Sequence, residues 1–173
     1  MSNAKNQTGS SKNAPVRAAL IFKNPVMFLA FGGGSGLAPK APGTAGTVVA
    51  IPIAIMLSPL SFLHEVVIIS VMFLVGVGLC NYATGKLGVH DHSGIVWDEI
   101  VGYLIAVLFV PHSWIWWLTG FVLFRFFDIV KPWPIRELDH RISGGFGIML
   151  DDVVAGIFAA IVLAILQLGR HLM

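Results

Sequence analysis

Four mainly apolar stretches of this chain, outside the glycine-rich segment, run for at least 16 residues without a charged side chain, and this feature limits the possible folds more than any other. They are residues 48–63, 66–82, 100–124 and 153–168. Because a membrane-spanning helix needs about 20 mostly apolar residues, the stretches predict an integral membrane protein. Charged residues make up only 12% of the chain, whereas soluble domains contain roughly 25%.

The expected fold class is an all-α, integral membrane helical bundle of four to five short spans. The predicted spans are residues 48–63, 66–82, 100–110, 114–124 and 148–168. A polar turn at His64 and Glu65 is expected between the first two, and Pro111 breaks the apolar run between the third and fourth. Spans three and four therefore form a helical hairpin.

The N-terminal part of the chain is expected to differ from the bundle. Residues 1–17 are polar and rich in Ser, Asn and Lys, which predicts a disordered tail. Lys23 and Pro25 interrupt residues 18–31, so this segment favours an interfacial helix over a span. Residues 18–173 then form a single membrane-embedded domain.

Lysine and arginine residues gather on one side of the predicted bundle. If the five spans alternate in direction, nine of the eleven basic residues lie in the tail and loops of one side, whereas Arg170 alone lies on the other. The positive-inside rule makes the basic side cytoplasmic. We therefore expect a multi-pass membrane protein whose polar loops face the cytoplasm.

Two acidic pairs stand where the third and fifth apolar runs begin. They are Asp98 with Glu99, and Asp151 with Asp152. Acidic side chains inside membrane helices are costly and therefore suggest a functional site. We predict that the two pairs face each other and share a divalent cation.

The first pair is expected to lie inside its helix. A helix of residues 100–111 would have 12 residues and measure roughly 18 Å, which is too short for a hydrocarbon core of about 30 Å. The helix should therefore begin near Ser93 and carry Asp98 and Glu99 in its first turns. Gly102, Gly120 and Gly156 would let three such helices approach closely.

A group of charges is therefore expected where spans three, four and five meet. It contains Asp98, Glu99, Asp128, Asp151 and Asp152 together with Arg125 and Lys131. Five negative charges against two positive ones leave a formal charge of −3, which needs a compensating cation at a membrane boundary. Hard carboxylate oxygens without a thiolate favour Mg²⁺, Mn²⁺ or Ca²⁺ over zinc. Mg²⁺ is the predicted cofactor, and its predicted ligands are Asp98, Glu99, Asp151 and Asp152.

Groups suited to an anion accompany these acids. The predicted phosphate-binding side chains are Arg125, Lys131, Arg136 and Thr44, with backbone amides of the glycine-rich residues 32–47. A metal beside cations indicates phosphoryl chemistry. The candidate catalytic residues are Asp98, Glu99, Asp128 and Asp152. Residues 32–36 are not followed by Gly-Lys-Ser/Thr, so nucleotide hydrolysis is not supported.

Simpler structural interpretations stay open for the same residues. Acidic side chains in the first turn of a helix interact favourably with the helix dipole. Arg125 and Asp128, at positions i and i+3, can pair with each other. Thr44 is equally a candidate helix cap.

Several stretches resemble the phosphatidylglycerophosphatase A family. They are residues 31–39, 41–47, 89–92, 95–99, 124–135 and 144–152. The resemblance implies a Mg²⁺-dependent enzyme of the bacterial inner membrane that hydrolyses phosphatidylglycerol phosphate to phosphatidylglycerol and inorganic phosphate. Its implied partners are this lipid and other membrane lipids, with no nucleic acid, and a homo-oligomer is compatible with the sequence.

The residues alone leave other functions and routes open. The acidic residues could belong to a small cation transporter or channel component. The basic side could instead belong to a non-catalytic protein that binds anionic lipids. For hydrolysis, attack by water is favoured, and a covalent aspartyl-phosphate route is the alternative.

Overall fold

The computed structural model describes residues 16–89, 92–133, 135–137 and 142–171, and this part of the chain is helical, with turns and bends between the helices. Its elements are α1 Ala18–Lys23, α2 Pro25–Ala30, the 3₁₀ helix η1 Gly32–Leu37, α3 Pro42–Leu57, α4 Phe62–Leu87, α5 Trp97–Val107, α6 Trp114–Val130 and α8 Gly144–His171. The predicted all-α fold class is confirmed. Residues 1–15 of the predicted disordered tail lie outside the described residues.

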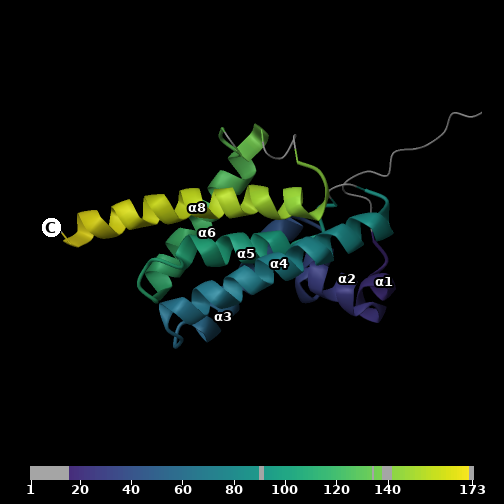
Figure 1. Cartoon of the computed structure of the whole chain (residues 1–173), viewed down its shortest axis with the longest axis horizontal. Coiled ribbons are helices and arrows are strands. Elements are labelled where there is room, and N and C mark those ends of the chain that lie inside the picture. Colours follow the sequence, from purple (N-terminus) through teal and green to yellow (C-terminus); the bar gives the residue numbers. More distant parts are fainter. Residues whose placement is uncertain (1–15, 90–91, 134, 138–141, 172–173) are drawn as a thin grey trace, which may run out of the picture.

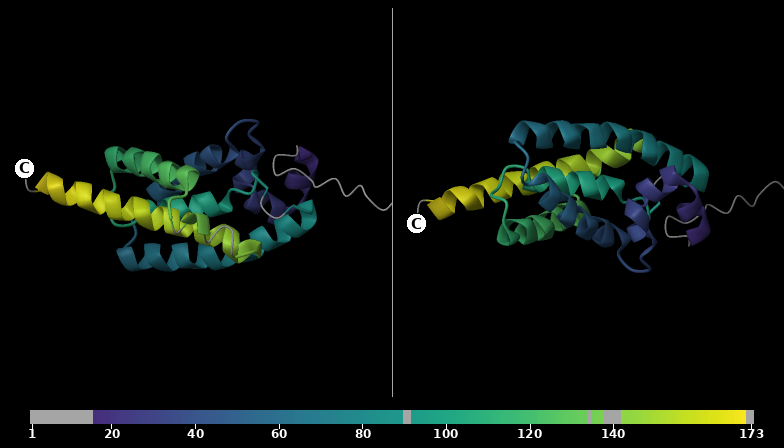
Figure 2. Two further views of the ribbon diagram at one scale, coloured as in Figure 1. Left: turned by 90° about the horizontal axis from the view of Figure 1, so that it is seen from above. Right: turned by 90° about the horizontal axis from the view of Figure 1, so that it is seen from below.

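Helix α5 occupies the centre of the bundle. It packs against α3, α4, α6 and α8, and these helices surround it in two perpendicular views (Figures 1 and 2). No residue of α5 is exposed. The hydroxyl of Tyr103, which is fully buried, donates a hydrogen bond to the Trp117 backbone carbonyl at 3.0 Å and so links α5 to α6.

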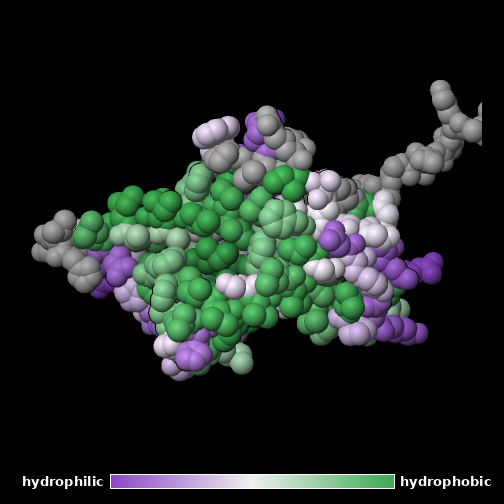
Figure 3. All heavy atoms as spheres, in the orientation of Figure 1, coloured by the Kyte–Doolittle hydropathy of each residue, from purple (hydrophilic) through white to green (hydrophobic). Residues whose placement is uncertain are grey.

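The outer surface of the bundle is apolar over most of its length. Hydrophobic residues cover the middle of the face in Figure 3, and hydrophilic residues gather at the end where α1, α2 and the C-terminal part of α4 lie. Side chains such as Leu74 on α4 and Ile165 on α8 are 70% and 64% exposed. Such a broad apolar surface is unfavourable in water and fits a membrane environment.

Two described helices are long and apolar enough to cross a membrane. They are α4 with 26 residues and residues Gly144–Arg170 of α8 with 27. Helix α3 is apolar but has only 16 residues, and it begins at Pro42, six residues before the predicted span. The helix lengths thus support two spans, and the total of four to five stays a prediction.

The turn predicted at His64 and Glu65 is wrong, because both residues lie in the first turn of α4. The chain turns earlier, around Pro59. Glu65 is buried inside the bundle, and its Oε1 lies 3.4 Å from His112 Nε2 in the loop before α6. Because His112 comes from a distant part of the chain, its contact with Glu65 cannot be seen in the local sequence pattern. The contact lets a carboxylate lie inside α4, where the pattern alone predicted a turn.

The length predicted for the third span is also wrong. Helix α5 has 11 residues and begins at Trp97, not near Ser93. The prediction assumed that the helix itself must cross the hydrocarbon core. Because neighbouring helices enclose α5, its length does not have to match the bilayer. Asp98 and Glu99 nevertheless lie in its first turn, as predicted.

The predicted interfacial helix at residues 18–31 is two short helices. Pro25 occupies the first turn of α2, and the side-chain oxygen of Asn24 accepts hydrogen bonds from the backbone N–H groups of Val26 and Met27. A proline lacks the N–H that would continue the preceding helix, and an asparagine cap starts the next one. Met27 is fully buried, so this segment belongs to the core.

Candidate active site

A cavity of about 260 Å³ lies at one end of the bundle, where four helix ends meet. The N-terminal turns of α3, α5 and α8 contribute to its walls, together with the C-terminal end of α6. Its charged lining residues are Asp98, Glu99, Asp128, Asp151, Asp152, Arg125 and Lys131. The predicted convergence of spans three, four and five is confirmed, and α3 adds a fourth wall.

Close contact between α5 and α8 brings the two acidic pairs together. A Cβ atom on Gly102 would lie 2.7 Å from the backbone carbonyl oxygen of Asp152, and one on Gly156 would collide with the carbonyl oxygen of Gly102. Each glycine follows an acidic residue, Asp98 or Asp152, by four positions, which is about one helical turn. The glycine contact therefore places Asp98 and Asp152 at the same level of the two helices.

Three buried or partly buried carboxylates form the centre of the cavity. Asp98, Glu99 and Asp152 each offer one oxygen atom, and these atoms lie within 4.8 Å of one another. Glu99 Oε2 and Asp152 Oδ2 are buried and have no hydrogen-bond partner within the described part of the chain. Three negative charges at this separation repel one another strongly unless a cation lies between them. The oxygen-only donor set fits a hard divalent cation.

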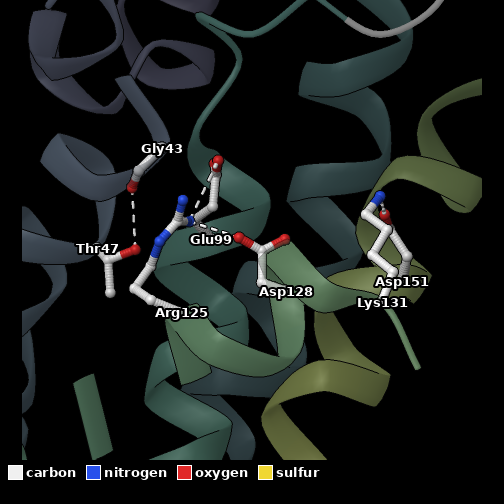
Figure 4. A network of polar contacts seen from close by, with 7 residues as sticks. All are labelled: Gly43, Thr47, Glu99, Arg125, Asp128, Lys131 and Asp151. Carbon is white, nitrogen blue, oxygen red and sulfur yellow. Dashed lines mark hydrogen bonds and ion pairs between the residues drawn. The ribbon is translucent and has the colours of Figure 1, made fainter. Parts of the chain in front are cut away.

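The fourth predicted metal ligand occupies a different position. Asp151 Oδ2 lies 2.6 Å from Lys131 Nζ, and this ion pair joins α8 to the residue that ends α6 (Figure 4). Lys131 adopts a left-handed backbone conformation with a φ of 43°, which turns the chain away from the helix axis. Asp151 thus lines the same cavity and balances Lys131, outside the group of three close carboxylates.

Arg125 lies between two carboxylates at the cavity wall. Its Nη1 is 2.6 Å from Asp128 Oδ2 and 3.9 Å from Glu99 Oε1 (Figure 4). The i to i+3 pairing that the sequence allowed is therefore confirmed, and it joins a contact to α5. Because all three side chains line the cavity, the pairing orients the guanidinium group without removing it from the site.

Sequence reasoning included Gly43 in the glycine-rich segment expected to bind phosphate, but it missed that this residue lies in the first turn of α3. A Cβ atom on Gly43 would collide with Glu99 Oε1 and lie 3.1 Å from Arg125 Nη1, so only glycine fits there without displacing these groups. Ala41 and Pro42 extend this wall. The sequence did contain a signal for the start of a helix here, because proline is common at the first helical position. We nevertheless expected a loop at these residues.

Two predicted phosphate-binding residues do not line the cavity. Thr44 lies in the first turn of α3 and is half-buried, and Arg136 is exposed. The alternative of Thr44 as a helix cap is wrong, because Ala41 occupies the cap position of α3. Thr47, one turn further on, donates its hydroxyl hydrogen bond to the Gly43 carbonyl at 2.9 Å (Figure 4).

Carboxylates that face basic side chains in one cavity, at the end of an apolar bundle, are the groups that an enzyme acting on phosphate esters uses. Sequence comparison assigns this protein to a family of that class. A sequence model of phosphatidylglycerophosphatase A matches residues 28–167. The chain therefore belongs to the phosphatidylglycerophosphatase A family, and it is a phosphatase.

Individual relatives cover most of the chain. Phosphatidylglycerophosphatase A of Haemophilus influenzae is 46% identical over 162 residues, 91% of this chain and 97% of the relative. The Escherichia coli protein of the same name is 42% identical over 156 residues, 90% of either chain. A Bacteroides thetaiotaomicron protein named "Putative phosphatidylinositol-3-phosphatase" is 39% identical over 142 residues, 78% of this chain and 88% of the relative. No solved structure matches the chain.

Proposed function

We propose that this protein hydrolyses the phosphomonoester of phosphatidylglycerol phosphate, in a Mg²⁺-dependent reaction at the cytoplasmic face of the membrane. The observation that carries the proposal is the group of three close carboxylates, Asp98, Glu99 and Asp152, in one cavity with Arg125. The names of the relatives from Haemophilus influenzae and Escherichia coli supply the lipid.

Each charged residue of the cavity has a role in this proposal. Asp98, Glu99 and Asp152 would hold Mg²⁺, which when bound stabilises negative charge on the phosphate and promotes ionisation of a water molecule. Arg125 donates hydrogen bonds to the phosphate oxygens, and Asp128 keeps the guanidinium group in place through its 2.6 Å contact. Lys131 adds a second positive charge. Asp151 is proposed to position Lys131 and not to bind the metal.

The reaction itself needs little covalent work by the protein. A water oxygen forms the new bond to phosphorus as the water gives up a proton, the bond from phosphorus to the glycerol oxygen breaks, and the released glycerol oxygen gains a proton. Positioning and charge neutralisation supply most of the rate enhancement in such phosphoryl transfers. Attack by the Asp98 or Asp152 carboxylate, with an aspartyl-phosphate intermediate, is the alternative route.

Phosphate release from detergent-dispersed phosphatidylglycerol phosphate tests the proposal directly. We expect Mg²⁺ to raise the rate at least tenfold above that in chelator, because a metal-bound site stabilises several kcal/mol of transition-state charge. Phosphatidylinositol 3-phosphate serves as the comparison lipid. Absence of phosphate release from either lipid, combined with Mg²⁺-dependent cation flux in vesicles, would favour the transporter alternative instead.

The proposed cytoplasmic orientation follows from the basic side of the bundle. Lys23 in the last turn of α1 and Lys86 in the last turn of α4 lie at the same end of the bundle as the first turn of α5 (Figures 1 and 2). Basic residues near the ends of spans favour the cytoplasmic side.

Cysteine labelling in intact bacterial cells checks this orientation. Lys86 in the last turn of α4 and Leu60, two residues before the helix begins, are both exposed, and the native Cys80 is buried and should give little background. A membrane-impermeant maleimide should label Leu60→Cys in intact cells, and Lys86→Cys only after permeabilisation. The opposite pattern would place the site outside the cytoplasm.

A further inference from the structure

A second cavity, of about 560 Å³, adjoins the site cavity. The two cavities share three lining residues, Ala41, Pro42 and Ser93. The other walls of the second cavity come from the end of η1, which includes Leu37, from the connection to α3, which includes Ala38, and from the loop before α5. A ligand whose phosphate occupies the site cavity therefore has a neighbouring space within a few bonds.

The two cavities differ sharply in charge. The site cavity has seven acidic or basic lining residues, whereas no aspartate, glutamate, lysine or arginine lines the second cavity among the described residues. The side chains of Phe31 and Leu37 make part of its surface apolar, and those of His92 and Ser93 add hydrogen-bonding groups. A surface of this kind suits an uncharged part of a ligand that has both carbon and hydroxyl groups.

The second cavity is held firmly against the catalytic end of α5. A Cβ atom on Gly36 would collide with the backbone carbonyl of Gly94, so η1 and the loop before α5 touch through their backbones. The Val96 N–H also donates a hydrogen bond to the Ala30 carbonyl at 2.9 Å. Val96 lies two residues before Asp98. The position of the cavity is therefore fixed relative to the carboxylates.

His92 is the polar side chain of the cavity with a defined orientation. Its Nδ1 accepts a hydrogen bond from the Gly94 N–H at 3.0 Å, and its ring packs beside Phe31 with 6.0 Å between the ring centres. The imidazole thus adds a polar group to the cavity wall beside the apolar Phe31 ring.

We propose that the second cavity binds the polyol that carries the scissile phosphate and thereby selects among lipid phosphomonoesters. This inference rests on the proposed phosphatase function, since it takes the phosphate to occupy the site cavity. In phosphatidylglycerol phosphate the polyol is the terminal glycerol. A phosphomonoester with a small alcohol group would use the site cavity alone.

Calorimetric binding to the full chain in detergent with Mg²⁺ tests the inference without relying on turnover. Glycerol phosphate should bind about tenfold more tightly than methyl phosphate, a difference of about 1.4 kcal/mol. Ala38→Phe should abolish this preference by filling the cavity while leaving methyl phosphate affinity unchanged. Ala38 has φ −58° and ψ 130°, an extended conformation that accepts any side chain. Ala164→Phe, at an exposed position of α8, is the matched control.

A second variant covers the case in which Ala38→Phe fails to fold. Leu37→Ala enlarges the cavity and should weaken glycerol phosphate binding about fivefold without changing methyl phosphate binding. Equal affinities for the two ligands in the unmodified protein would overturn the inference, as would a preference retained in both variants. Failure of the proposed function shows differently, as an absence of phosphate release from either lipid in the assay above.

Discussion

Asp152→Asn is expected to lower the rate of phosphate release by about two to three orders of magnitude. Removal of one group that stabilises charge in an active site typically lowers the rate by a similar factor. Asp152 is one of the three carboxylates whose oxygens lie within 4.8 Å of one another, and its Oδ2 is buried. The amide retains the shape of the side chain but removes one negative charge from the proposed metal site. Mg²⁺ affinity should fall with the rate, so Mg²⁺ titrations of the variant should be shifted to higher concentration.

Glu65→Gln is the matched control for this charge change. Glu65 is also a buried carboxylate in the first turn of a helix, but it lies at the opposite end of the bundle beside His112. Its amide variant should keep the rate of phosphate release within about twofold, because surface or remote substitutions rarely disturb a distant site. Unchanged turnover in Asp152→Asn, with normal folding, would exclude Asp152 from the metal site.

Gly102→Ala is expected to reduce turnover about hundredfold, because a displacement near 1 Å at a catalytic site can cost that much. The added methyl group would lie 2.7 Å from the Asp152 carbonyl oxygen and 2.7 Å from the Phe124 ring. A backbone carbonyl cannot rotate away as a flexible side chain does, so α5 and α8 must separate. Overpacking of this kind should also destabilise the protein by about 1–3 kcal/mol.

Thermal unfolding in detergent and turnover should be measured together for this variant. Gly78→Ala is the matched control, since Gly78 lies on α4 and a Cβ atom there meets no heavy atom within 4 Å. Alanine in a helix is intrinsically more favourable than glycine, so the control should be as stable as the unmodified protein or slightly more. Full activity in Gly102→Ala would show that the acidic pairs do not depend on this helix contact.

Much of the site could be predicted because its residues break the pattern of their surroundings. Carboxylates at Asp98 and Asp152 interrupt apolar runs, and a glycine follows each by one turn, which is a local signal of a close helix contact. Arg125 and Asp128 end the fourth apolar run in the same way, and they lie near the C-terminal end of α6. These features depend on short sequence spacing, which a chain displays before it folds.

The missed features depend on which side of a helix faces which neighbour. Asp151 and Asp152 are adjacent in sequence, but successive helical residues point about 100° apart, so one pairs with Lys131 and the other joins Asp98. The role of Gly43 arises from contact with Glu99, 56 positions further along the chain. No local pattern contains such information.

The central position of α5 has a consequence for how a lipid could reach the carboxylates. Since no residue of this helix is exposed, its apolar character reflects the packing of a protein interior and not solubility in hydrocarbon. The carboxylates of its first turn instead line the cavity at the end of the bundle, where four helix ends meet. A lipid headgroup would enter end-on, from the interfacial layer, while its acyl chains stay in the surrounding bilayer.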